Sequence, residues 1–382
     1  SPEYEFRGQA LTDIVGTGGM GVVYKIITPA GPRALKITPV STDPISFPGK
    51  QDGIVPLRIT YNSGKRINVW NAGIPRWRQV RRKNRLHPGE TRKLQLGIYD
   101  REVMKRIRDI ETIIPSLDAH LLGIAGYLCT GTEMPYHEGD TLEAEIRKGV
   151  NVRTAMEAIG SVGKTLRKVH SRGIRHGDVK PDNIFITSKG NALLFDWSIA
   201  RFVDTYRPLP GEPKDIAILL REFEKDTENI LFGTPGYISP EAVIKVISTA
   251  ADIWGLGVSA FEVLTGDDLF SQRRWSGRDP EHDVISQLIA VSETWRKETR
   301  QRMIDKNISD DVADATLRAL ELSEYERTAE PLIAIADSFS RGELPSYEIR
   351  SVLAHSGTVI EDPEKFERAK TGFKVKRQVQ MV

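Results

Sequence analysis

The sequence predicts an α+β fold with two parts, a β-rich first lobe and a mainly helical second lobe. Residues 10–38 alternate short β-branched runs with glycine, which is typical of a small antiparallel sheet. From about residue 150 the apolar residues recur with helical spacing instead, and Gly173 is a suitable helix stop. The helical stripe consists of Ala155, Ile159, Val162, Leu166 and Val169.

The composition is that of an ordinary globular protein, since 39% of the 382 residues are hydrophobic. Lys and Arg total 54 against 52 Asp and Glu, so the net charge of +2 by itself implies neither a nucleic-acid nor a membrane partner. The only cysteine, Cys129, excludes an internal disulfide and favours a reducing compartment. No run approaches the length of a membrane span. We therefore expect action in the cytoplasm, or in a host cytosol if the protein is a secreted effector.

Residues 39–95 are predicted to be an insertion, because they are rich in proline and glycine and show no sustained period. From Lys65 to Lys93 the insertion carries ten Lys or Arg and one acid, with Trp70 and Trp77 interleaved. The favoured interpretation is a solvated loop whose tryptophans pack on the first lobe. The alternative is a contact surface for an acidic protein partner, whereas nucleic acid is not expected.

A glycine run, Gly16-Thr17-Gly18-Gly19-Met20-Gly21-Val22-Val23, lies between two predicted strands, where backbone without side chains can approach phosphates closely. Alone it fits a glycine-rich hairpin equally well. The next strand carries Ala34-Leu35-Lys36, and this lysine is suited to hold phosphate oxygens as a charged donor. For the lysine alone, a solvated surface position is the simpler interpretation.

The most specific pattern begins at Ile174-Arg175-His176-Gly177-Asp178-Val179-Lys180-Pro181-Asp182-Asn183. A short strand with Phe185, a polar turn and Leu193-Leu194-Phe195-Asp196 follow it. Phosphoryl transfer needs little covalent help, so a protein must position a hydroxyl, neutralise phosphates and fix magnesium. The side chains suited to these tasks are Asp178, Lys180, Asn183 and Asp196.

In these motifs and their order, over about residues 10–340, the chain resembles the eukaryotic-like (Hanks-type) protein serine/threonine kinase family. The resemblance implies a two-lobed protein kinase fold that transfers the γ-phosphoryl group of ATP, with Mg²⁺, to hydroxyls of protein substrates. It implies that Asp178 orients the acceptor, that Lys180 stabilises the moving phosphoryl group, and that Asn183 and Asp196 hold magnesium. By motif position, the expected ATP contacts are Val15, Gly16, Gly18, Gly21, Val23, Ala34, Lys36 and Phe185.

The resemblance also predicts the organisation of the chain. Residues 1–134 form the first lobe with the insertion, residues 135–345 the second lobe, and residues 346–382 a C-terminal extension. We expect a hinge near Met134-Pro135-Tyr136-His137, with ATP between the lobes. The segment from Asp196 to Glu241 is longer than a minimal activation segment, and a short helix in it could dock substrate or cover the protein itself. The face of that helix would be Ile216, Leu219, Leu220 and Phe223.

The end of this segment, Gly233 to Glu241, resembles the substrate platform of the family, with Ser239-Pro240-Glu241 in place of the usual Ala-Pro-Glu. The resemblance implies that Glu241 pairs with Arg327. It also implies that Asp252, in a buried helix, accepts backbone hydrogen bonds from the catalytic loop. Lys180 together with Thr234 resembles the serine/threonine class more than the tyrosine class.

Two departures from the family pattern qualify this prediction. Gly177 stands where many regulated kinases carry an arginine that clamps a phosphorylated activation loop, so loop phosphorylation is not expected to be required. Trp197-Ser198 replaces the usual Phe-Gly, which should hinder a flipped inactive state. Small-molecule kinases share both variants and remain an alternative, as do a pseudokinase scaffold that binds ATP and a partner, and another nucleotide transfer. Lys180 and the platform favour a protein substrate.

Two acids compete as the ion-pair partner of Lys36. Positions three, four and seven after Glu102 are charged, whereas the same positions after Asp100 are Val103, Met104 and Ile107. This apolar stripe indicates a helix that packs inward on the side of Asp100. We therefore favour Asp100, with Glu102 as the alternative.

Overall fold

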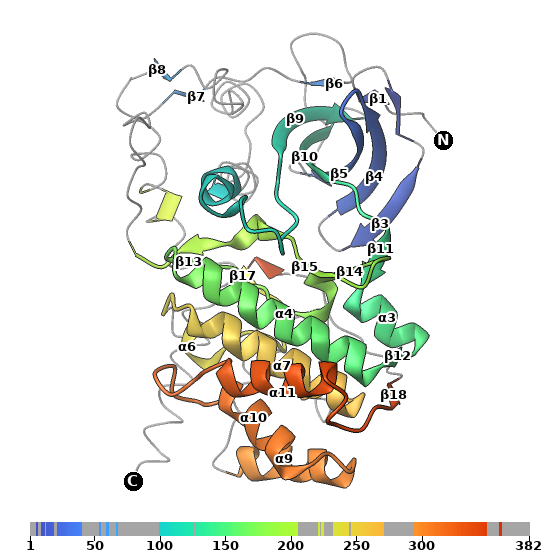
Figure 1. The fold of residues 1–382 in the computed structure, drawn as a ribbon. Helices are drawn as coiled ribbons and strands as arrows, with labels where there is room; N and C mark the ends of the chain where they lie inside the picture. Colours follow the sequence, from blue (N-terminus) through green and yellow to red (C-terminus); the bar gives the residue numbers. More distant parts are fainter. Residues whose placement is uncertain are drawn as a thin grey trace. The chain divides into compact units, whose positions relative to one another are not determined.

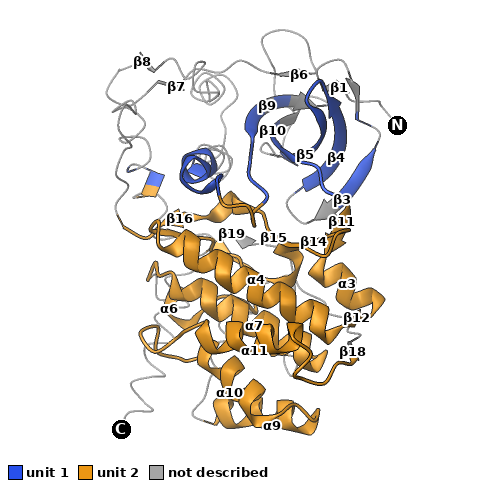
Figure 2. Cartoon of the chain, viewed as in Figure 1, with its two compact units in different colours: residues 1–109, 114–137, 206–223 blue, residues 110–113, 138–205, 224–382 orange. Residues whose placement is uncertain are grey.

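The structure is a computed structural model whose described residues form two compact units (Figure 2). Unit 1 comprises residues 1–109, 114–137 and 206–223, and unit 2 comprises residues 110–113, 138–205 and 224–382. The described residues are 5–6, 9–11, 13–18, 21–39, 53–54, 59–60, 66–67, 99–124, 127–204, 221, 223–224, 232–243, 246–270, 294–349 and 359–360.

Unit 1 is built on a curved antiparallel sheet of six strands in the order β3-β4-β5-β10-β9-β6 (Figure 1). The expected strands of residues 10–38 are confirmed, since the chain runs through two consecutive hairpins there. The strands are β3 (Ile14–Gly18), β4 (Gly21–Thr28), β5 (Gly31–Pro39), β10 (Tyr127–Pro135), β9 (Asp118–Ile124) and β6 (Gly53–Ile54), beside a separate pair of β1 (Glu5–Phe6) and β2 (Gln9–Ala10).

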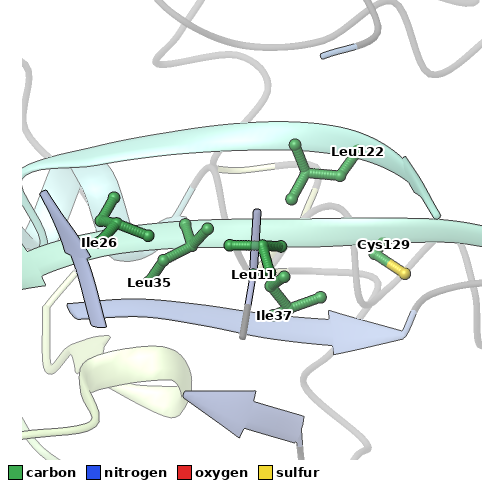
Figure 3. Close-up of a cluster of buried hydrophobic side chains, with 6 residues drawn as sticks. All are labelled: Leu11, Ile26, Leu35, Ile37, Leu122 and Cys129. Atoms are coloured by element: carbon green, nitrogen blue, oxygen red, sulfur yellow. The ribbon is translucent and has the colours of Figure 1, made fainter. Parts of the chain in front are cut away.

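One face of this sheet carries a small apolar core (Figure 3). Successive side chains of a strand point to opposite faces, so Leu35 and Ile37 are buried in this core while Ala34 and Lys36 point to the other face. Burial raises the pKa of the Cys129 thiol to about 11, which keeps it protonated at neutral pH. The core consists of Leu11, Ile26, Leu35, Ile37, Leu122 and Cys129.

Most of the predicted insertion at residues 39–95, with Trp70, Trp77 and nearly all of its basic residues, lies outside the described residues. Within it the structure places only β6, paired with β9, and a two-stranded sheet of β7 (Ile59–Thr60) and β8 (Arg66–Ile67). Its interpretation as a loop or as a surface for an acidic partner stays a prediction.

Unit 2 is mainly helical, and the expected α+β fold is thereby confirmed. The long helix α4 (Val152–His170) packs against both α7 (Ala250–Thr265) and α11 (Glu330–Ser340) (Figure 1). The other helices are α3 (Leu142–Lys148), α6 (Pro240–Val243), α9 (Trp295–Asp305), α10 (Asp310–Ala319) and the 3-10 turns η2 (Pro181–Asn183) and η3 (Trp197–Ile199).

The predicted helix around Ala155 is confirmed as α4. It begins after Asn151, whose side-chain oxygen accepts a hydrogen bond from the backbone N–H of Arg153 at 2.9 Å and so caps the helix. The chain turns away at Gly173, which has a φ of 68°, a left-handed conformation that favours glycine. The apolar stripe of α4 is buried as expected.

Short strands complete unit 2. The three-stranded sheet is β11 (Gly139–Thr141), β14 (Ile184–Thr187) and β15 (Ala192–Leu194). The two-stranded pairs are β12 (Val150–Asn151) with β18 (Glu348–Ile349), β13 (Ile174–Arg175) with β16 (Arg201–Phe202), and β17 (Phe232–Gly233) with β19 (Val359–Ile360).

A four-residue stretch from the first half of the chain belongs to unit 2. In this stretch the Thr112 carbonyl accepts from the Leu194 N–H at 3.0 Å, and the Thr112 hydroxyl lies 2.6 Å from that of Thr165 in α4. Ile113 forms an isolated parallel bridge with Leu194. The two units are therefore interleaved in sequence, while the predicted domain boundaries stay a prediction.

Two glycines let α7 pack closely against Val179 of the loop after β13 and against Ala319 of α10. A Cβ on Gly255 would lie 2.5 Å from the Val179 carbonyl oxygen, and one on Gly257 would lie 2.9 Å from the Ala319 Cβ. No larger residue fits at either place without moving the backbone.

Among the helices that the structure describes, none is long and apolar enough to cross a membrane.

The predicted pair of Glu241 and Arg327 is confirmed. The guanidinium donates to both carboxylate oxygens, at 2.5 and 3.1 Å, and to the Ala250 carbonyl at 2.9 Å. Both side chains are buried, with 7% and 0% of their surface exposed. The pair ties α6 at the end of the platform to the start of α7.

We expect Arg327→Met to lower the free energy of unfolding by about 3–5 kcal/mol, because it leaves the Glu241 carboxylate buried without its countercharge. Urea unfolding followed by circular dichroism measures the change. The matched control is Arg167→Met, which removes an ion pair with Glu330 whose partners are 61% and 59% exposed, and should cost at most about 1 kcal/mol. Equal losses in both variants would contradict the structural role of the buried pair.

Candidate active site

The loop that follows β13, residues 176–183, is anchored to α7 through hydrogen bonds with Asp252. The backbone N–H groups of His176 and Gly177 donate to its two carboxylate oxygens, each at 2.7 Å, as the sequence predicted. The His170 ring nitrogen lies 2.8 Å from Oδ2. Burial by itself would raise the pKa of Asp252. The hydrogen bond and charge of His170, the charge of His176 and the hydrogen bond from the Gly177 N–H outweigh this effect, so the pKa of Asp252 is lowered.

His176 links this loop to the segment that carries Asp196. Its Nδ1 accepts from the Asp178 N–H at 3.2 Å, so Nε2 carries the proton and donates to the Phe195 carbonyl at 2.8 Å. The Trp197 ring packs edge-on against it, with centroids 4.6 Å apart. The prediction gave His176 no role, although its position two residues before Asp178 puts its ring within reach of the Asp178 backbone N–H.

Asp178 is the centre of a buried polar cluster. Its Oδ1 accepts from the Thr234 hydroxyl at 2.8 Å, and its Oδ2 lies 3.0 Å from both the Asn183 Nδ2 and the Lys180 Nζ. Lys180 Nζ also donates to the Thr234 hydroxyl at 2.6 Å. The structure thus brings together three residues of the predicted site and adds the hydroxyl of Thr234, which the sequence had associated only with substrate class.

Lys180 is a permanent cation in this cluster. Burial disfavours the ammonium, yet the negative charges of Asp178, Asp182 and Asp196 outweigh that effect and hold the pKa of Lys180 above its ordinary value of 10.5. A fixed positive charge beside a carboxylate can stabilise a transferring anion without exchanging a proton.

Asn183 and Asp196 are suited to hold a magnesium ion. The Asn183 backbone carbonyl accepts from the Phe195 N–H at 3.1 Å, which keeps the next residue, Asp196, close to Asn183. Asp196 has a φ of 61° and a ψ of 68°, a left-handed conformation uncommon outside glycine. A carboxylate and a carboxamide oxygen are the hard ligands that Mg²⁺ prefers, so the donor set fits this ion.

The backbone explains why residue 177 is a glycine. Gly177 has a φ of 87°, and a Cβ there would lie 3.2 Å from the Ile199 carbonyl oxygen. An arginine at this position would be strained. The absence of an arginine before Asp178 therefore follows from the conformation that the loop adopts.

Four of the expected ATP contacts of the first lobe, namely Gly16, Val23, Ala34 and Lys36, share one face of the unit 1 sheet. Val23 is paired with Lys36 and with Gly16 across neighbouring strands, and Ala34 lies two residues before Lys36 on the same face. A Cβ on Gly21 would lie 2.1 Å from the Ile37 carbonyl oxygen, so glycine is required there.

The remaining predicted ATP contacts, Val15, Gly18 and Phe185, lie in different surroundings. Val15 in β3 is 44% exposed, and Gly18 pairs with Gly21 at the hairpin end. Phe185 belongs to unit 2, where its ring is edge-on to Phe195 with centroids 6.2 Å apart. The assignment of all these residues to ATP stays a prediction.

Residues 99–107 of unit 1 are helical, and the stripe of Val103, Met104 and Ile107 is buried as expected. Both candidate acids are buried, since Glu102 is 1% exposed and Asp100 is 7% exposed. Both Glu102 oxygens accept from Lys105 Nζ at 2.7 Å. The ammonium of Lys105 supplies the countercharge for this buried carboxylate. The choice between the two acids stays a prediction.

Of the predicted helix within the long segment, Phe223 is described and is fully buried in unit 1, with its ring 5.3 Å from that of Tyr99. The prediction missed Tyr99 as its contact. Ile216, Leu219 and Leu220 lie outside the described residues.

The family model described as "Protein kinase domain" matches residues 85–336. This stretch contains Asp178, Asn183 and Asp196, and it begins after the glycine run and Lys36.

Three curated relatives are similar in sequence. The serine/threonine-protein kinase PknK of Mycobacterium bovis is 25% identical over 320 residues, which cover 82% of this chain and 22% of the relative. The serine/threonine-protein kinase PknD of Protochlamydia amoebophila is 32% identical over 155 residues, which cover 35% and 15%. The PknD of Chlamydia trachomatis is 29% identical over 184 residues, which cover 42% and 19%. The matches span about a fifth of the relatives' length.

We expect Asp252→Asn to lower the free energy of unfolding at neutral pH by about 2–4 kcal/mol, because an amide nitrogen cannot accept from the loop N–H groups. Since the pKa of Asp252 is lowered on folding, its stabilisation is complete above the ordinary value of 3.8 and declines as the pH falls below it. Urea unfolding of both proteins between pH 7 and about pH 3 measures the difference.

The control is Asp337→Asn, which weakens a half-exposed pair with Lys164 and should change stability by less than about 1 kcal/mol. A difference between Asp252→Asn and the intact protein that does not shrink in acid would contradict the role of the charged carboxylate.

Proposed function

Because this chain belongs to the protein kinase family, we propose that it transfers the γ-phosphoryl group of ATP to serine or threonine hydroxyls of proteins, with Mg²⁺ as the metal ion. The observation that carries the proposal is the buried cluster in which Lys180 and Thr234 hold the Asp178 carboxylate. The names of the relatives support the serine/threonine class.

In this proposal Asp178 orients the acceptor hydroxyl and takes its proton as the phosphoryl group arrives. Hydrogen bonds from Thr234 and Asn183 fix the direction of the carboxylate beforehand, so no reorganisation is needed during transfer. The permanent charge of Lys180 stabilises the oxygens of the moving group.

Asn183 and Asp196 would hold magnesium, which when bound neutralises phosphate oxygens. His176 joins the catalytic loop to the Phe195 carbonyl and thereby keeps Asp196 beside Asn183. Lys36, on the sheet face that also carries Val23 and Ala34, is the proposed donor to the ATP phosphates.

We propose that activity does not require phosphorylation of the activation segment. The conformation of Gly177 disfavours an arginine that could clamp a phosphate there. The buried Trp197, packed on His176, opposes a flip of the Asp196 segment. The single cysteine of the chain, Cys129, is free and buried, which is compatible with a reducing cytoplasm, and we propose this location.

Two alternative functions remain weaker. A pseudokinase scaffold would have no need of the four residues Lys36, Asp178, Asn183 and Asp196, all of which are present. A small-molecule kinase would have no need of the platform, which a buried ion pair between Glu241 and Arg327 stabilises here.

The first test is radiolabelled phosphate transfer from ATP and magnesium to the chain itself and to dephosphorylated casein. We expect phosphoserine or phosphothreonine, and a loss of about 10²–10⁴-fold in rate for Asp178→Ala and for Asp196→Ala. The control Asp311→Ala, at an exposed site on α10, should retain full activity. Transfer that persists in Asp178→Ala, or that occurs only to small molecules, would contradict the proposal.

A second pair of variants identifies the partner of Lys36. We expect Asp100→Ala to lower kcat/KM for ATP by about tenfold or more, because the pair with the lysine is lost, and Glu102→Ala to retain most activity. Thermal unfolding of both variants shows whether the loss of a buried acid has merely destabilised unit 1. The reverse order of activities would assign the role to Glu102.

A further inference from the structure

Three side chains that can ligate metals meet on one face of the unit 1 sheet. Asp118 and His120 are two residues apart in β9, so their side chains point to the same face, and Glu133 of β10 is directly opposite Asp118. One ligand atom from each of the three residues lies within 4.8 Å of the other two. The sheet register therefore brings an imidazole and two carboxylates to one point.

The distances between the ligand atoms are close to those around a small divalent cation. The His120 Nε2 lies 3.7 Å from the Asp118 Oδ2 and 2.6 Å from the Glu133 Oε1. Ligand atoms that bind one tetrahedral Zn²⁺ at about 2.0–2.2 Å lie about 3.3–3.6 Å apart. The first distance nearly matches that value. The second is a hydrogen-bond distance, which a rotation of the Glu133 side chain would widen by about 0.7 Å to admit the ion.

Neighbouring donors hold both carboxylates in position. The Glu133 Oε2 accepts from the Arg33 guanidinium at 2.7 Å, and the Asp118 Oδ1 accepts from the Ala119 N–H at 2.9 Å. Each carboxylate thus has one oxygen engaged by such a donor and the other directed toward the His120 ring. Hydrogen bonds of this kind orient the ligands of metal sites and contribute to metal affinity.

The cluster is buried on one side and accessible on the other. The Glu133 side chain is fully buried and that of His120 is 8% exposed, whereas that of Asp118 is 50% exposed. An ion can therefore enter on the side of Asp118. The buried side keeps bulk water away from the other two ligands, which strengthens their electrostatic interaction with a cation.

The nitrogen ligand narrows the choice of ion. Magnesium and calcium prefer oxygen ligands, whereas an imidazole with carboxylates suits zinc and similar transition-metal ions. We propose that Asp118, His120 and Glu133 bind one divalent cation of the zinc class, with water as the fourth ligand on the exposed side. The ion joins the start of β9 to the end of β10 and thereby stabilises unit 1. This inference does not rest on the proposed kinase function.

The first test titrates the full chain with Zn²⁺ after treatment with a chelator, in excess Mg²⁺ and with a competing zinc-binding dye. We expect one Zn²⁺ per chain with a Kd of about 1 µM or lower. In His120→Gln the affinity should fall at least about 100-fold. The glutamine amide can still donate to Glu133 but its nitrogen has no lone pair for a metal, so this variant separates a metal ligand from a hydrogen-bond donor.

A second variant changes a residue at the surface. Asp118→Ala replaces a half-exposed side chain, so it should fold as the intact chain does and lower the Zn²⁺ affinity at least about tenfold. The matched control, Asp13→Ala, removes an exposed carboxylate from the same unit and should bind zinc as the intact chain does. Circular dichroism verifies folding, and Asp118→Ala decides the question if His120→Gln does not fold.

Thermal unfolding and the visible spectrum of bound Co²⁺ give independent measurements. Zn²⁺ should raise the Tm of the intact chain and of Asp13→Ala by several degrees, but not that of His120→Gln or Asp118→Ala. Co²⁺ should show the strong visible absorption of a tetrahedral complex in the same two proteins only. The inference would be overturned if the intact chain bound no zinc, or if Asp118→Ala bound it as tightly as the intact chain.

Discussion

The catalytic loop depends on one buried carboxylate. Asp252 sits on the rigid helix α7 and binds the loop through backbone N–H groups, so it fixes the path of the chain whatever the side chains are. Gly255, one turn along, brings the same helix against the Val179 carbonyl. From this base the loop presents Asp178, Lys180 and Asn183 to one another with little freedom left. The geometry of the site thus depends on the position of α7 in the core of unit 2.

The Asp178 cluster is stabilised by one charged donor and two neutral hydrogen-bond donors. Lys180 offsets part of the negative charge of three aspartates, while Thr234 and Asn183 supply hydrogen bonds without adding charge. Thr234 comes from the platform, whose far end is held by the Glu241–Arg327 pair. The platform and the Asp178 carboxylate are therefore parts of one hydrogen-bonded network, and β19 pairs with β17 at its edge.

Much of this arrangement was predictable from sequence because its determinants are local or have strong spacing. The strands with Ile14 and Lys36 and the helix α4 follow from periodicity, whereas the contacts of Asp252 and Glu241 were implied by the resemblance to the kinase family. The pairing of β17 with β19 was not predictable, because each strand has two residues and the strands are more than 120 positions apart in the chain. So short a strand shows no alternation of apolar and polar residues that would indicate its partner. Helical periodicity did not indicate that Glu102 is buried as well as Asp100, because it counts apolar neighbours and does not register an ion pair such as the one with Lys105.

The exchange of short stretches between the two units bears on how the protein is made. Residues 110–113 leave the first half of the chain to join Leu194 and Thr165, while Phe223 returns from the second half to Tyr99. Domains of a growing chain ordinarily fold in the order in which they emerge from the ribosome. Here unit 1 cannot acquire all its contacts until residue 223 has been synthesised, when residues 138–205 of unit 2 have already been made and residues 224–382 have not. Unit 1 is therefore completed only after a part of unit 2 has been made, so no single cut of the chain separates the two units.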